Sequence, residues 1–176
     1  RTLALASPLV LGRMPQMTSP PPIAPTPVHA CCTHQLFERV ARDNPAAIAA
    51  RCSGTAYTYV ELNERANRLA GHLRELGAGP DAIVGIFLDR GLEMLVALLA
   101  IHKAGAAYLP LDASYPAERL AYMMEDAKAP VILTQRRLIE KVSKGTARIV
   151  AIDEDWPTIA RHPNANPRSG VTQENL

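Results

Sequence analysis

Apolar side chains fall at two alternating spacings along the chain, and this alternation predicts a mixture of helices and strands. Between residues 62 and 76 they recur every three or four positions, which places them on one face of a helix. The residues of this face are Leu62, Ala66, Leu69, Leu73 and Leu76. Thr58 and Glu61 have the separation of a capping box at the start of the helix, and Gly77 and Gly79 follow its last turn.

Short apolar runs alternate with helical segments downstream. The runs read as buried strands at 83–88, 106–111, 130–134 and 148–153. The helices between and around them are expected at 92–103, 117–128 and 136–143. Strand and helix in this repeated order predict an α/β fold with a mainly parallel sheet and crossover helices. A helix ending at Asn44-Pro45 and a hairpin turning at Ser53-Gly54 are expected to precede the sheet.

Prolines are concentrated near the N-terminus, where seven of the fifteen lie in the first 32 residues. The stretch Thr18–Pro27 favours an extended polyproline II conformation and is incompatible with a helix or a central strand. We therefore expect residues 1–32 to form a disordered linker and residues 33–176 to form the folded region. Residues 1–11 are mildly apolar, but they lack the basic region and cleavage site of a secretion signal.

Composition and charge exclude several classes of protein. With 48% hydrophobic and 20% charged residues, the 176-residue chain can bury a core and is not disordered as a whole. The formal net charge of +2 is too balanced to indicate a nucleic-acid partner. No apolar run approaches the ~20 residues of a membrane-spanning helix. Three cysteines, an odd number, exclude a disulfide framework that uses every thiol, so we expect reduced thiols and a cytoplasmic location.

Two glycine-containing segments match parts of nucleotide-binding sequence motifs. Gly77–Ala82 matches the dinucleotide-binding pattern, but it follows a helix, precedes a strand and contains Pro80, which lacks an amide hydrogen. Lys144-Gly145-Thr146 resembles the end of a phosphate-binding loop, but the upstream glycine is missing and a strand follows. We interpret the first as a helix end and the second as a solvated turn.

Four potential metal ligands lie close together at the start of the predicted folded region. They are His29, Cys31, Cys32 and His34. Zinc sites need four ligands that converge tetrahedrally, usually from two separated pairs, and adjacent cysteines strain that closure. We therefore expect no zinc here, and we interpret His34 as a cap of the first helix.

Asp89 and Asp112 follow two of the predicted strands, at the edge where parallel sheets keep their ligand sites. Either carboxylate can contact a ligand there, but Asp at a strand–helix junction more often caps the following helix, which is the interpretation we favour. His72 and His102 lie on helices without a partner at a recognisable spacing. No arrangement of residues typical of a catalytic site is present.

Two longer segments resemble core motifs of adenylate-forming enzymes. Tyr57–Ala70 resembles the first core motif, and Lys103–Asp126 resembles the second. The second has the long form, Tyr-Leu-Pro-Leu-Asp followed by Tyr-Pro-x-x-Arg-Leu, that is characteristic of amino-acid adenylation domains of nonribosomal peptide synthetases. Gly91, His102 and Ala113 replace the usual residues of the family and alter only local capping, packing and rigidity. The resemblance covers roughly residues 33–176.

The resemblance implies the N-terminal portion of the large domain of such an enzyme, ending before its phosphate-binding loop. Ser169–Leu176 resembles the segment that immediately precedes this loop. In the parent reaction, an amino-acid carboxylate attacks the α-phosphate of ATP to give aminoacyl-AMP and pyrophosphate. The aminoacyl group then passes to a phosphopantetheine thiol on a carrier domain. The implied cofactors are ATP and magnesium, and the implied partners are neighbouring condensation and carrier domains.

In that family both motifs form scaffold, so the resemblance assigns no catalytic, cofactor-binding or metal-binding residue to this chain. The chain is therefore expected to be inactive alone. Two alternatives remain open at this point: a fragment of an acyl-CoA or aryl-acid ligase, and a non-catalytic fragment that binds a partner.

The predicted parallel sheet also leads to an expectation about the solubility and stability of the isolated chain. Parallel sheets are normally covered on both faces. If part of that cover comes from outside this sequence, an apolar face and a strand edge stay open, which favours aggregation. We therefore expect the isolated chain to be poorly soluble or partly molten.

Overall fold

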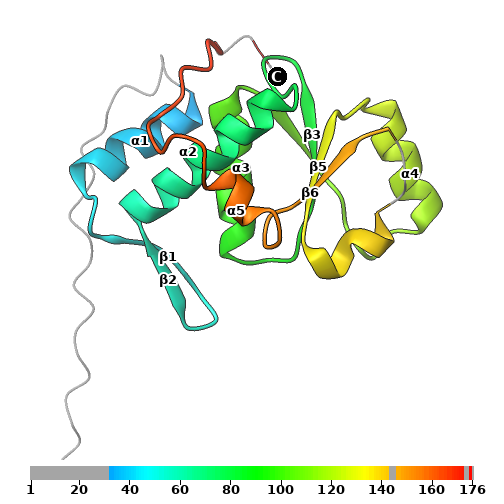
Figure 1. Cartoon of the computed structure of the whole chain (residues 1–176), viewed down its shortest axis with the longest axis horizontal. Helices are drawn as coiled ribbons and strands as arrows, with labels where there is room; N and C mark the ends of the chain where they lie inside the picture. The colour runs from blue at the N-terminus through cyan, green and yellow to red at the C-terminus, as the bar shows by residue number, and fades with distance from the viewer. Residues whose placement is uncertain (1–31, 143–145, 173–174, 176) are drawn as a thin grey trace, which may run out of the picture.

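A four-stranded parallel sheet lies at the centre of the computed structural model, which describes residues 32–142, 146–172 and 175 (Figure 1). The strand order is β4-β3-β5-β6. The strands are β3 (Ile83–Phe87), β4 (Ala107–Pro110), β5 (Val131–Thr134) and β6 (Arg148–Ala151). All three strand pairs are parallel. The predicted α/β fold and its parallel sheet are therefore confirmed, with each strand one or two residues shorter than expected.

Helices cover both faces of this sheet (Figure 1). On one face, α2 (Tyr59–Glu75) and α3 (Leu92–Ala104) pack against the strands, with α5 (Trp156–Ile159) beside them. On the other face lie α4 (Ala117–Asp126) and the 3-10 helix η2 (Arg136–Lys141). The chain thus forms a three-layer sandwich with one apolar cluster on each side of the sheet.

The two central strands, β3 and β5, are largely buried. Ile86 and Leu133 point into the cluster shared with α2 and α3, whereas Phe87 and Ile132 point into the cluster shared with α4. None of these four side chains is more than 2% exposed. The expectation of an open apolar face is therefore wrong, because α4 and η2 supply the second layer from within the sequence. Only the edge strands β4 and β6 lack a neighbour on one side among the described residues.

The predicted boundaries of α2 are confirmed in detail. The Thr58 amide donates to Glu61 Oε2 at 2.8 Å, and the Glu61 amide donates to Thr58 Oγ1 at 3.3 Å, which completes the capping box. At the other end Gly77 takes a φ of +94°, a left-handed conformation that glycine adopts without steric cost. The interpretation of Gly77–Ala82 as a helix end is therefore confirmed.

The first elements lie to one side of the sheet. Helix α1 (Thr33–Asp43) is followed by an antiparallel hairpin of β1 (Ile48–Cys52) and β2 (Thr55–Thr58), which projects from the body (Figure 1). The N-cap of α1 is Cys32, whose amide donates to the side chain of Gln35 at 3.2 Å. His34 lies inside the first turn of α1 and is buried, and the N-cap is Cys32, so the predicted capping role of His34 is wrong. Nearly all of the predicted linker, residues 1–31, lies outside the described residues.

Helix α5 was not predicted. It spans four residues with Pro157 in its first turn, so it is too short to show an apolar period. Its buried residue is Ile159, which packs into the cluster under α2. Among the described residues, no helix has the length and apolar character needed to cross a membrane.

Candidate functional site at the carboxyl edge of the sheet

Polar side chains gather where β3, β5 and β6 end, the edge at which open parallel sheets bind ligands. Gln135, directly after β5, accepts a hydrogen bond from the Asp89 amide at 3.3 Å and donates one to Glu93 at the start of α3. Asp153, after β6, accepts a hydrogen bond from the Arg136 amide at 2.9 Å. The side chains at this edge thus bind mainly to one another.

Neither aspartate singled out from the sequence caps a helix. The Asp89 carboxylate pairs with Arg137, and the N-cap of α3 is Gly91. Asp112 accepts a hydrogen bond from the Ser114 amide at 2.8 Å, and the N-cap of α4 is Pro116. The hydrogen bond from the Ser114 amide lowers the pKa of Asp112 below its usual value. The helix-cap interpretation is therefore wrong for both residues, and Asp112 instead stabilises the turn before α4.

A shallow pocket of about 260 Å³ lies between this edge and α2. Its lining residues are Tyr57, Arg65, Glu93, Val96, Ile152, Asp153 and Trp156. The guanidinium carbon of Arg65 stands 4.7 Å from the ring centroids of both Tyr57 and Trp156. This stacking occupies the aromatic faces that a ligand would use, and the volume is below the usual range for drug-sized ligands. The stacked Arg65 guanidinium therefore joins α2 to β2 and α5.

A buried polar network lies between the helices on the α2 side of the sheet. The Lys103 ammonium, on α3, is fully buried, pairs with Glu38 of α1 and lies 3.3 Å from Asn166 Oδ1. Asn63 and Asn67, on α2, donate to the same oxygen at 2.9 Å each. Burial lowers the pKa of Lys103, and the contact with Glu38 opposes that shift. The network thus ties the segment after α5 to three helices.

The sequence offered little signal for this network. Asn166 lies about one hundred residues from Asn63 and Asn67 along the chain, and it stands in a region without an apolar pattern. Asn67 Nδ2 also donates to the Asn164 carbonyl at 2.6 Å. Lys103 stands in the last turn of α3, where a lysine interacts favourably with the helix dipole, so its place in the sequence does not indicate that it is buried.

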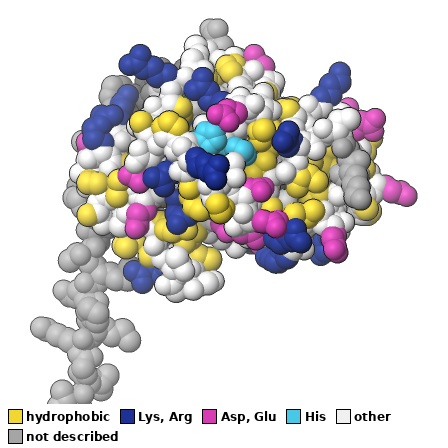
Figure 2. Space-filling model, in the orientation of Figure 1, with side chains coloured by type: hydrophobic (Ala, Val, Ile, Leu, Met, Phe, Trp, Pro, Cys, Tyr) yellow, Lys and Arg dark blue, Asp and Glu magenta, His cyan; other side chains and the backbone are white. Residues whose placement is uncertain are grey.

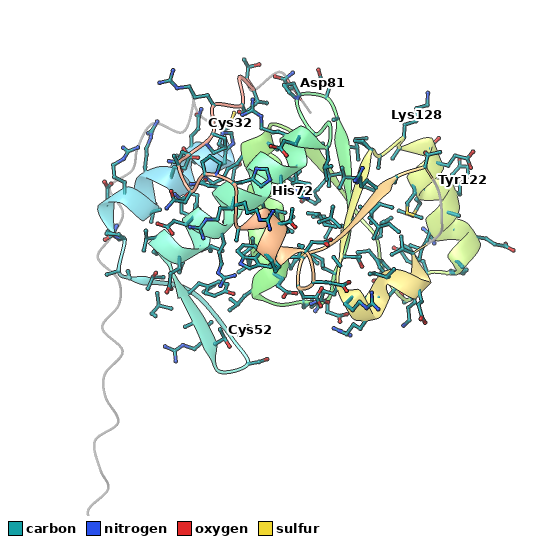
Figure 3. All side chains as sticks on the ribbon, in the orientation of Figure 1. Cys32, Cys52, His72, Asp81, Tyr122 and Lys128 are labelled. Carbon is teal, nitrogen blue, oxygen red and sulfur yellow. The ribbon has the colours of Figure 1, made fainter. Side chains whose placement is uncertain are left out.

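The candidate zinc ligands near the N-terminus are only partly described. His29 and Cys31 lie outside the described residues, as do Lys144 and Gly145 of the second glycine motif. The Cys32 sulfur lies 4.0 Å from the Val171 carbonyl oxygen, and Cys32 belongs to the upper part of the molecule in Figure 3. A different group of potential ligands meets at His72, for which sequence analysis predicted no partner; His162 lies 3.2 Å from it.

Lowering the pH from 7 to 5 is expected to decrease the free energy of unfolding. Burial lowers the pKa of His34, His72 and His102 below the ordinary value of 6.5. The unfolded chain then binds these protons at a higher pH than the folded chain does. The stabilising contribution is complete above about pH 6.5 and is lost as the pH falls through 6.5 toward the folded-state pKa. Urea unfolding at both pH values measures the change.

The groups that surround His34 and His102 show which variant can serve as a control for this pH dependence. Burial is the largest cause of the lowered pKa of His34; Glu38 opposes it, whereas Lys103 and His102 act in the same direction as burial. The His102 ring contacts the Tyr108 ring edge-on, and burial alone lowers its pKa. The His102→Gln variant should therefore show a smaller decrease than the wild type. A wild-type free energy of unfolding that rises from pH 7 to pH 5 would contradict the expectation.

Known proteins resemble this chain over most of its length. A family model described as AMP-binding enzyme matches residues 37–174. A linear gramicidin synthase of Brevibacillus parabrevis is 42% identical over 145 residues, which are 82% of this chain and 3% of that protein. Tyrocidine synthase 3 of the same organism is 50% identical over 133 residues, or 75% of this chain and 2% of that protein. The chain thus spans a small part of these much longer relatives.

Solved structures agree with the sequence comparison. A crystal structure of a nonribosomal peptide synthetase with α-methyl-L-serine-AMP bound has a TM-score of 0.78 and 34% identity. The similarity covers 86% of this chain and 17% of that chain. The NpsA protein of Klebsiella oxytoca, in complex with 3-hydroxyanthranilyl-AMSN, has a TM-score of 0.64 at 21% identity, which shows a shared fold.

Proposed function

This chain belongs to the family of AMP-binding enzymes, and from that membership we propose that it forms the N-terminal part of an amino-acid adenylation domain of a nonribosomal peptide synthetase. The single observation that carries the proposal is the 50% identity to tyrocidine synthase 3 over 133 residues. At 21% identity, the likeness to NpsA supports only a common fold and favours no second function.

The proposed activity is that of the complete domain. An amino-acid carboxylate attacks the α-phosphate of ATP, the bond to the β-phosphate oxygen breaks, and pyrophosphate leaves as aminoacyl-AMP forms. A phosphopantetheine thiol on a carrier domain then displaces AMP from the aminoacyl group. Condensation and carrier domains are the proposed neighbours, since the relatives are far longer than this chain.

The described residues contribute scaffold to that activity. The carboxylates at the carboxyl edge are engaged by other side chains, since Asp89 pairs with Arg137 and Glu93 accepts from Gln135. They do not fit a magnesium site, which needs carboxylate oxygens free to bind the ion. We therefore assign magnesium, ATP and phosphopantetheine to none of the described residues. The network around Lys103 holds the segment at Asn164–Asn166 against the helices, and Ser169–Leu176 follows it.

A segment exchange tests the proposal. Residues 37–174 of this chain replace the matching segment in an adenylation domain of tyrocidine synthase 3. The chimera is expected to catalyse amino-acid-dependent exchange of pyrophosphate into ATP with the amino-acid preference of the host domain. The 176-residue chain alone, assayed in parallel, is expected to show no exchange, because its sequence contains no complete phosphate-binding loop: at Lys144-Gly145-Thr146 the upstream glycine is missing and a strand follows.

Two outcomes would count against the proposal. A chimera that is monodisperse and folded but inactive, beside an active host domain treated identically, would show that the segment is not equivalent to that of an adenylation domain. Exchange by the 176-residue chain itself would show that phosphate binding arises within these residues. A chimera carrying Lys103→Met serves as the damaged control, since it disrupts the network without touching the carboxyl edge.

A further inference from the structure

Three potential metal ligands meet on the outer side of α2, away from the carboxyl edge of the sheet. His72 and Glu75 are three residues apart on the helix and therefore share one face. His162, from the segment after α5, lies against both of them: its Nε2 is 3.2 Å from His72 Nδ1, and its Nδ1 is 3.7 Å from Glu75 Oε1. One ligand atom of each residue lies within 4.8 Å of the other two.

The packing around His162 is specific to this position. A Cβ atom at Gly71 would lie 3.2 Å from both Cβ and Nδ1 of His162, so the absence of a side chain on Gly71 admits the ring. The two imidazole rings meet edge to face, with centroids 5.2 Å apart. Segments 90 residues apart in the sequence are thus brought together with their ring nitrogens facing each other.

The cluster is partly open to solvent, mainly on the side of Glu75. The His162 side chain is 12% exposed, and the Glu75 side chain is 71% exposed. Figure 2 shows histidine side chains at the surface of this face, with an acidic side chain next to them. Figure 3 shows His72 itself among the helices at the centre of the same view. An ion from solution can therefore reach the three ligands without unfolding any element.

Two histidines and one carboxylate are a donor set that zinc uses with a fourth position open to water. Zinc–nitrogen bonds of about 2.0–2.1 Å in a tetrahedron place two ligand nitrogens roughly 3.3 Å apart. The His72–His162 nitrogen separation of 3.2 Å matches that value. Because Glu75 is exposed, its carboxylate can turn toward the same point by a rotamer change.

We propose that His72, Glu75 and His162 form a zinc-binding site that links α2 to the segment following α5. The bound ion takes the place of the hydrogen bond between the two rings, and a water molecule completes its coordination. The site lies outside the proposed catalytic machinery, so its effect is on the docking of residues 160–172 and not on adenylation chemistry.

The test uses the purified 176-residue chain after treatment with a chelator. Zinc is added in a calorimetric titration, and cobalt is added in a parallel absorption experiment that reports tetrahedral coordination. One zinc ion per chain is expected to bind and to raise the melting temperature. The His162→Gln and His72→Gln variants are each expected to weaken binding by at least about tenfold, the scale on which even supporting residues act.

Matched variants separate this site from other possibilities. Gly71→Ala keeps all three ligands but crowds His162, so it is expected to weaken zinc binding as well. His102→Gln, a histidine outside the cluster, and Cys31→Ser with Cys32→Ser should leave binding unchanged. Absence of stoichiometric binding, or binding lost only in the cysteine variant, would overturn the proposal. Because Glu75 is largely exposed, Glu75→Gln preserves the fold and is expected to weaken binding without lowering the zinc-free melting temperature.

Discussion

The Lys103→Met variant is expected to lower the free energy of unfolding by about 3–5 kcal/mol, the usual cost of breaking a buried ion pair from one side. Lys103 is fully buried on α3, and its ammonium pairs with Glu38, whose side chain is only 14% exposed. Removing the ammonium leaves the Glu38 carboxylate desolvated without its partner. It also removes one of the donors to Asn166 Oδ1. Equilibrium unfolding in urea measures the loss.

A second variant keeps this prediction testable if the first does not fold. In the double variant Lys103→Met with Glu38→Gln, the unpaired charge is gone, so part of the lost stability should return. Lys141→Met, at an exposed position in η2, is the matched control and should change stability by less than about 0.5 kcal/mol. A loss equal to that of the control would show that Lys103 is not buried in the folded chain.

The Ile132→Ala variant is expected to lower the free energy of unfolding by about 2–5 kcal/mol, as buried isoleucine truncations do. Ile132 is 1% exposed and belongs to the cluster that also contains Leu120 and Met124 of α4. Truncation removes packed methyl groups and leaves a cavity between the sheet and the helix. The measurement reports whether α4 covers this face in the isolated chain, which is the point on which the sequence-based expectation was wrong.

An exposed residue on the same helix provides the comparison. Tyr122 is 68% exposed and points away from the body of the molecule (Figure 3). Tyr122→Ala should therefore cost less than about 0.5 kcal/mol. Equal effects of the two substitutions would show that the α4 face is not a packed core. Cooperative unfolding with a large difference between them would also contradict the expectation of a partly molten chain.

Much of the fold could be predicted because its determinants are local. The capping box at Thr58 and Glu61 and the left-handed glycine at Gly77 act within a few residues, so their spacing in the sequence is sufficient. Gly105, with a φ of +90°, ends α3 in the same way. The apolar runs of β3 and β5 also carried a clear signal, because strands covered on both faces have few polar positions.

The polar contacts could not be predicted in the same way. Asp89 pairs with Arg137 across the carboxyl edge of the sheet and does not cap its own helix, because the register of neighbouring strands brings the two residues together. Helix α5 has only four residues, and its burial depends on α2. The helix and strand propensities of individual residues do not predict contacts between segments that are distant in the sequence.

By itself, the sequence determined where the strands and every helix but the four-residue α5 lie, that the sheet is parallel, and through two motifs which family the chain resembles. The positions of these elements follow from hydrophobic period, capping and turn residues, which act between near neighbours, whereas the resemblance rests on the two motifs alone. Only the tertiary structure decided that α4 closes the second face, that Lys103 meets Glu38 and Asn166, and that His72 meets His162. The Lys103 and His72 contacts join residues about 60 to 90 positions apart, and the position of α4 depends on a crossover connection. Such contacts form only once the chain has folded around its sheet.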